Sequence, residues 1–156
     1  MTKRASEGEF GKALRDVDVA GIVFKPPDDG RNWKPCDYMV WVQWGEGVDS
    51  IWFECKDVDA VDRFPFAELR PSQLQGIRDA ERVGIPYWLA VYWRRHKAWT
   101  ISDAAKVMRW LEEERRPPNN QNPTSIPRRL LMSRFGIDAT PATLSSVLKS
   151  VLLGDV

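Results

Sequence analysis

Residues 85–92 form an almost wholly apolar run directly after Gly84. Such a run is typical of a strand buried on both faces, so other elements must cover both sides of its sheet. Residues 97–101 have the pattern of its hairpin partner. Because helical patterns stand on both sides of these runs, the chain is predicted to be an α/β protein with a mixed central sheet flanked by helices.

A second hairpin is predicted earlier in the chain. Tyr38–Trp44 is aromatic and β-branched, Gly45–Asp49 has turn composition, and Ser50–Lys56 alternates between two faces. The period of two places Glu54 and Lys56 side by side on one face. Asp37 stands where the first of these strands opens.

The remaining elements follow from cap and turn signals. Ser6, with Glu9 three residues later, is expected to cap a helix that ends at Gly21. The other expected elements are a strand at Ile22–Phe24, loops at Lys25–Lys34 and Asp57–Arg70, a helix at Ser72–Arg82 after Pro71, and a helix from Ser102 or Asp103 to about Arg115.

The domain organisation is predicted from a proline- and asparagine-rich segment. Residues 1–116 form the main domain and residues 117–125 a linker. Residues 126–156 form a small C-terminal helical appendage with short helices at Ile126–Phe135 and Thr143–Leu153.

Composition excludes several kinds of site. One histidine and two cysteines without a CxxC pair cannot supply a four-ligand structural zinc site, and a catalytic triad could form only through His96. The first eight residues lack the apolar region of a signal peptide, and no apolar run approaches the roughly 20 residues that span a bilayer. We expect a soluble, cytoplasmic protein that does not enter a membrane.

The net charge of +1 gives no argument for nucleic acid, but the charges are separated along the chain. Acidic residues gather in the first half, while the basic residues that could contact phosphates are Arg94, Arg95, Lys97, Arg128 and Arg129. Solvated surface charge explains them equally well. Three tryptophans with an exposed pattern, or the C-terminal helices, could supply a dimer interface: Trp93, Trp99 and Trp110.

Asp37, Glu54 and Lys56 form the constellation that could carry chemistry. Two carboxylates facing each other across a hairpin suit a hard divalent cation, and an adjacent lysine can orient water or offset phosphate charge. The alternative is a cross-strand salt bridge on a solvated face.

Four motifs in the same order resemble the PD-(D/E)xK nuclease core, and more narrowly the bacterial RecU family of Holliday junction resolvases. They are Asp37-Tyr38, Phe53-Glu54-Cys55-Lys56, Phe64-Pro65-Phe66 and Ser72-Gln73. The resemblance covers roughly residues 7–102 and implies a restriction-endonuclease-like core. The long stalk that RecU proteins carry before the Asp-Tyr motif is absent here.

The resemblance also implies residue roles. Asp37, Glu54 and the backbone carbonyl of Cys55 would ligate Mg²⁺, with Mn²⁺ as a substitute. Lys56 and Gln73 would position the attacking water and the phosphate. Glu9 is the choice for a first-helix acid, with Glu7 as the alternative.

The activity implied is metal-dependent hydrolysis of a DNA phosphodiester to a 5′-phosphate and a 3′-hydroxyl. The implied partners are four-way junction DNA, a second copy of the chain in a homodimer and a branch-migration helicase, in a bacterial or phage recombination and repair setting. Another nuclease of this superfamily, or a non-catalytic DNA-binding protein with the same fold, are the alternatives.

Overall fold

The computed structural model describes residues 3–28, 34–44, 46–113 and 123–156. Within them, the main sheet has six strands in the spatial order β1-β2-β3-β5-β6-β8. Only β3 and β5 pair in parallel, so the sheet is mixed. These strands are β1 (Ile22–Phe24), β2 (Tyr38–Trp44), β3 (Gly47–Val58), β5 (Tyr87–Trp93), β6 (Ala98–Asp103) and β8 (Gly136–Ala139).

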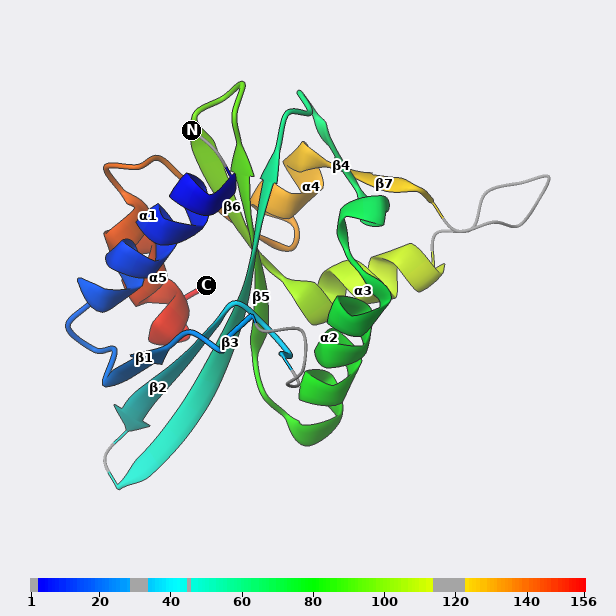
Figure 1. The fold of residues 1–156 in the computed structure, drawn as a ribbon. Coiled ribbons are helices and arrows are strands. Elements are labelled where there is room, and N and C mark those ends of the chain that lie inside the picture. Colours follow the sequence, from blue (N-terminus) through cyan, green and yellow to red (C-terminus); the bar gives the residue numbers. More distant parts are fainter. Residues whose placement is uncertain (1–2, 29–33, 45, 114–122) are drawn as a thin grey trace.

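Helices cover both faces of this sheet, which confirms the predicted α/β class (Figure 1). On one side, here called the α1 face, α1 and α5 pack against β3 and its neighbours. On the other, the α2 face, α2, α3 and α4 cover β3, β5 and β6. The helices are α1 (Lys3–Arg15), α2 (Pro71–Val83), α3 (Ala104–Glu113), α4 (Arg128–Ser133) and α5 (Leu144–Leu152).

One predicted helix cap and one predicted loop were wrong. The helix α1 begins at Lys3 and ends at Arg15, so Ser6 is not its cap; the Ser6 hydroxyl instead donates to the carboxylate of Asp57 at 2.8 Å. The expected loop after Lys56 contains the end of β3, a short strand β4 (Arg63–Pro65) and a 3₁₀ turn, η1 (Phe66–Glu68).

The predicted α2 is confirmed. Pro71 is its first residue, and Gly84 ends it in a left-handed conformation with φ of 79°. Only a residue without a Cβ adopts this conformation readily. Asp103 caps α3 as predicted, because its carboxylate accepts the backbone N–H of Lys106 at 3.2 Å.

The C-terminal segment is not a separate helical appendage. Ser125–Pro127 forms β7, which pairs with β4, and β8 adds a sixth strand to the main sheet beside β6. Leu144 and Leu148 of α5 belong to the same core cluster as Phe10 of α1. Residues 126–156 therefore complete the main domain, while most of the predicted linker, residues 117–122, lies outside the described residues.

The tryptophans proposed for a dimer interface are also placed differently from the prediction. Trp93, Trp99 and Trp110 are all buried, because both faces of β5 and β6 are covered. They stabilise the core and offer no interface. No helix within the described ranges is long and apolar enough to cross a membrane.

Candidate active site

The first acidic residue, Asp37, lies directly before β2 and is held against β3. Its backbone N–H donates to the carbonyl of Phe53 at 2.9 Å, which extends the β2–β3 ladder by one residue. Its carboxylate accepts the backbone N–H of Cys55 at 2.9 Å. The pairing of the two strands therefore fixes both the position and the rotamer of this buried side chain.

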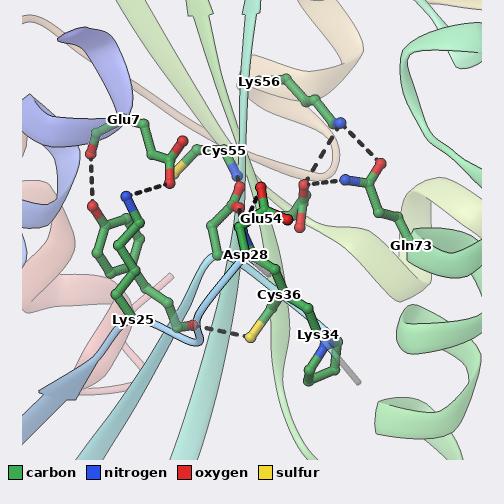
Figure 2. Close-up of polar contacts among 12 residues, drawn as sticks. Glu7, Lys25, Asp28, Lys34, Cys36, Glu54, Cys55, Lys56 and Gln73 are labelled. Carbon is green, nitrogen blue, oxygen red and sulfur yellow. Dashed lines mark hydrogen bonds and ion pairs between the residues drawn. The ribbon is translucent and has the colours of Figure 1, made fainter. Parts of the chain in front are cut away.

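Glu54 and Lys56 leave β3 on the same side, as the period of two predicted, and both point toward α2 (Figure 2). The Lys56 ammonium lies 3.6 Å from a Glu54 carboxylate oxygen, and the two side chains are only 2% and 3% exposed. The predicted alternative of a salt bridge on a solvated face is wrong, because neither group reaches bulk solvent. Such burial needs further polar partners.

Gln73, in the first turn of α2, supplies those partners. Its amide nitrogen donates to Glu54 at 2.6 Å, while its oxygen accepts from the Lys56 ammonium at 2.8 Å and from the backbone N–H of Arg70 at 2.9 Å. Since Lys56 and the Arg70 amide are both donors, the oxygen must face them and the nitrogen must face Glu54. The glutamine thus ties α2 to both functional groups of β3 (Figure 2).

Two residues that the sequence analysis missed complete the surroundings. The Tyr87 hydroxyl of β5 donates to the carbonyl of Pro35 at 2.6 Å and lies 3.4 Å from the second Glu54 oxygen. Lys34 places its ammonium 3.2 Å from the Asp37 carboxylate. Tyr87 sits in an apolar run that predicts only core packing, and Lys34 in a loop without a pattern.

Burial and the two neighbouring carboxylates determine the pKa values in the cluster. Burial, and then the neighbouring Asp37 carboxylate, raise the pKa of Glu54 from 4.5 to about 8, while Lys56 acts in the opposite direction. Burial would lower the pKa of Lys34, but the carboxylates of Asp37, Asp28 and Glu7 together raise it. The local field therefore favours additional positive charge beside Asp37 and Glu54.

A divalent cation fits this donor set. In the described part of the chain no three histidine, cysteine, aspartate or glutamate side chains converge, so the protein would offer two carboxylates, Asp37 and Glu54. Magnesium is commonly held by one or two carboxylates, with the remaining positions left to water and to substrate phosphates. After burial, the Asp37 carboxylate is the next cause of the raised pKa of Glu54, and a bound cation would offset this repulsion.

The two thiols do not offer a competing chemistry. Cys36 and Cys55 are buried, and desolvation, reinforced by the nearby carboxylates, raises the pKa of both. A thiol in this state is a poor nucleophile. The Cys55 side chain lies in the core of the α1 face, as expected.

The choice of Glu9 as the first-helix acid, with Glu7 as the alternative, stays a prediction, and the two residues have different surroundings. Glu7 forms an ion pair with Lys25 at 2.9 Å, its carbonyl accepts the Tyr38 hydroxyl at 3.0 Å, and its charge acts on Lys34. Glu9 instead acts on Tyr92, and one of its carboxylate oxygens is buried without a hydrogen-bond partner. Both lie in α1 only two residues apart, so the helix places them on different sides.

The predicted phosphate contacts divide into two groups. Arg94 pairs with the buried carboxylate of Asp57, and Arg95 lies 3.3 Å from Asp59. Lys97, in the β5–β6 turn, is exposed and has a positive φ of 48°. Arg128 and Arg129 begin α4 and line a pocket on the same end of the molecule.

Comparison with known proteins found a likeness to a solved structure. No family model matches the chain, and no curated protein does. The solved structure of Archaeoglobus fulgidus Hjc, a Holliday junction resolvase from an archaeal hyperthermophile, superposes with a TM-score of 0.49 and 17% sequence identity, covering 92% of this chain and 95% of that chain.

Proposed function

We propose that the chain is a divalent-metal-dependent DNA endonuclease that cuts four-way junctions. The observation that carries the proposal is the buried cluster of Asp37, Glu54, Lys56 and Gln73, in which two acids, an ammonium and an amide converge from the residue before β2, from β3 and from α2. The motif resemblance predicted these four residues together. The junction as substrate rests on that resemblance, and the geometry of the cluster supports phosphodiester hydrolysis.

Asp37 and Glu54 would hold the cation, and the backbone carbonyl of Cys55 stays a predicted third ligand. When bound, the ion supplies Lewis-acid stabilisation of the phosphate charge. The hydrogen bond from the Cys55 N–H and the ladder bond to Phe53 keep Asp37 in place before any ligand arrives. A preordered site of this kind loses little freedom on binding.

Lys56 would offset the charge that builds on the phosphate oxygens during attack by water. The position of its ammonium is fixed, because Gln73 accepts a hydrogen bond from it and a Glu54 carboxylate oxygen lies 3.6 Å away. Gln73 would act as a positioning residue that fixes both groups. Tyr87 would orient Glu54 from the opposite side, since burial and the Glu54 carboxylate raise its pKa and keep its hydroxyl protonated.

Two strands of a junction must be cut, so we further propose a homodimer with one active site for each strand. The opposed cuts would then release linear products with 5′-phosphate and 3′-hydroxyl ends. Mn²⁺ is expected to replace Mg²⁺, because carboxylate oxygen ligands suit both ions.

The test is cleavage of a labelled synthetic four-way junction beside a linear duplex of matched sequence, with Mg²⁺ or with EDTA. Wild type should make paired nicks near the crossover, and Glu54→Gln should lose them. Glu81→Gln is the matched control, because Glu81 is an exposed residue of α2 that pairs with Arg109. It should cut like wild type.

Each outcome decides between the alternatives. Equal cutting of duplex and junction would retain the metal-dependent nuclease and reject the junction as its substrate. Absence of cutting by folded wild type at every metal concentration would reject the enzyme and favour a DNA-binding protein with this fold.

A further inference from the structure

A basic pocket of about 370 Å³ opens between the β4–β7 pair, α4 and the β5–β6 turn, elements that lie together in Figure 1. The residues on its wall that matter here are Asp62, Arg63, His96, Arg128 and Arg129. Three arginines and a histidine face one carboxylate. A concave surface with this balance suits an anion.

Arg128 is the residue that points most directly to a ligand. Its backbone N–H donates to the carbonyl of Asp62 at 2.7 Å, and its guanidinium carbon lies 5.7 Å from the centre of the Trp93 ring. Its Nε–H is nevertheless buried without a hydrogen-bond partner. An unsatisfied donor of a charged group is unfavourable, so an acceptor in the pocket would stabilise this arrangement.

The neighbouring basic groups are held in place. Arg63 donates through Nε to the Ser125 hydroxyl at 2.7 Å and through a terminal nitrogen to the Ser125 carbonyl at 3.1 Å. His96 is anchored by its Nε2, 2.5 Å from the carbonyl of Val61. Because these contacts use only uncharged acceptors, the positive charge of Arg63 is not neutralised by them.

The pocket also differs from the rest of the basic region. Arg94 and Arg95 are paired with Asp57 and Asp59, whereas Arg128 and Arg129 form no ion pair with any residue that the structure describes. The carboxylate of Asp62 is the one acidic group on the wall. Unpaired cationic charge at this end of the molecule therefore concentrates in the pocket.

The position of the pocket relates it to the candidate active site. Trp93, under Arg128, pairs with Val58 in the β3–β5 ladder, and Val58 lies four residues beyond Glu54 on the same face of β3. At about 3.3 Å per residue this separation is about 13 Å along the strand. The pocket and the candidate active site thus lie on the same face of the sheet.

We infer that this pocket binds a backbone phosphate of the DNA whose scissile phosphate occupies the candidate active site. The inference rests on the proposed function for its ligand. Arg128 and Arg129 supply the direct contacts, Arg63 supplies charge, and Asp62 weakens the attraction. A second fixed phosphate contact would set the register of the DNA without reading its sequence.

The test is the affinity of the full chain for a labelled four-way junction, measured by fluorescence anisotropy in EDTA over a series of salt concentrations. The logarithm of the affinity falls as the logarithm of the salt concentration rises, and each phosphate contact adds about 0.9 to the steepness of this fall, here called the slope. Arg128→Gln with Arg129→Gln should therefore lower the slope by about 2 and weaken binding at least tenfold. Asp62→Asn should strengthen binding a few fold.

Two further variants control for the loss of positive charge in general and for disturbance of the core. Arg82→Gln removes the same charge from the last turn of α2, at the far end of the molecule, and should leave slope and affinity unchanged. Because Arg128 packs over Trp93, the single variant Arg129→Gln, at an exposed position, repeats the test without touching the core. It should lower the slope by about 1.

Inorganic phosphate distinguishes a free anion from the DNA backbone. If millimolar phosphate shifts the Arg128 Nε–H resonance but the arginine variants bind the junction like wild type, the pocket takes a free phosphate and the inference is overturned. Unchanged slopes without a phosphate effect overturn it too. Lowered slopes in a protein that never cleaves DNA would uphold the pocket and reject the proposed nuclease, so the two failures are separable.

Discussion

Replacing Glu54 by glutamine should stabilise the metal-free protein at alkaline pH while abolishing its activity. The folded pKa of Glu54, about 8, lies above its ordinary value of 4.5, so the native state holds a proton that the unfolded chain releases between these values. The stability that this proton contributes is fully present below pH 4.5 and is lost as the pH rises through 8. Glutamine carries no such proton and keeps the acceptor for Gln73.

The magnitude follows from the two pKa values. Stability changes by up to about 1.4 kcal/mol per pH unit for one proton. Between pH 5.5 and pH 8 the free energy of unfolding of wild type should therefore fall by about 3 kcal/mol relative to Glu54→Gln. Other ionisable groups contribute equally to both proteins and cancel in the difference.

Urea unfolding in EDTA, followed by the fluorescence of the 8 tryptophans, measures this difference at a fixed protein concentration. Glu81→Gln should track wild type within about 0.5 kcal/mol at every pH, as expected for an exposed pair. Adding Mg²⁺ should stabilise wild type most at pH 8 and leave Glu54→Gln nearly unchanged. A difference that stays constant from pH 5.5 to 8 would refute the assignment of a buried, partly protonated Glu54.

Three other substitutions test the site from different sides. Lys56→Met should keep Mg²⁺ binding, measured by calorimetry, yet reduce the cleavage rate by about 100-fold or more, because the phosphate loses a charged partner. Loss of metal affinity together with activity would contradict this role. Gly76→Ala should lower the free energy of unfolding, measured with urea, by about 1–3 kcal/mol, since its new Cβ would lie 2.7 Å from the Pro35 carbonyl oxygen. An unchanged unfolding midpoint would mean that the close contact between α2 and Pro35 is not needed. Tyr87→Phe should cost about 1 kcal/mol by losing its bond to Pro35 and lower the cleavage rate less than tenfold, whereas a loss as large as that of Lys56→Met would make Tyr87 catalytic.

The central part of the site could be predicted because strand geometry is local. The period of two in β3 places Glu54 and Lys56 on one face, and the hairpin register brings Asp37 beside them. The position of Gln73 followed from motif order. Its hydrogen bonds could not be predicted, since they depend on how closely α2 approaches β3, which Gly76 permits by leaving room for Pro35.

In the C-terminal segment the two predicted helices are confirmed as α4 and α5, but the strands β7 and β8 were not predicted, for a different reason. The strand β8 has only four residues, Gly136–Ala139, too few for a period to be visible. It exists because it pairs with β6, and Gly136 allows an approach in which a Cβ would come within 2.0 Å of the Ile101 carbonyl oxygen. Pairing between residues so far apart in the chain leaves no local pattern.

The choice between Glu7 and Glu9 shows the same limit on a finer scale. Both residues fall within one turn of α1. The helix begins three residues before the expected cap, and the sequence alone does not show which of the two side chains faces the cluster. Their surroundings depend on tertiary contacts: Lys25 pairs with the Glu7 carboxylate and the Tyr38 hydroxyl donates to the Glu7 carbonyl, whereas Glu9 acts on Tyr92.

The strand β3 connects the candidate active site with the basic end of the molecule through alternate side chains. On the α2 face Glu54 and Lys56 carry the site, and Val58 continues toward Trp93 and the pocket. On the α1 face Asp57 accepts from Ser6 and pairs with Arg94 in the β5–β6 turn. From Glu54 to Val58 this strand pairs with β5, and β5 pairs in turn with β6, so the sheet fixes the spacing between the metal ligands and the end of the strand that lies beside Trp93.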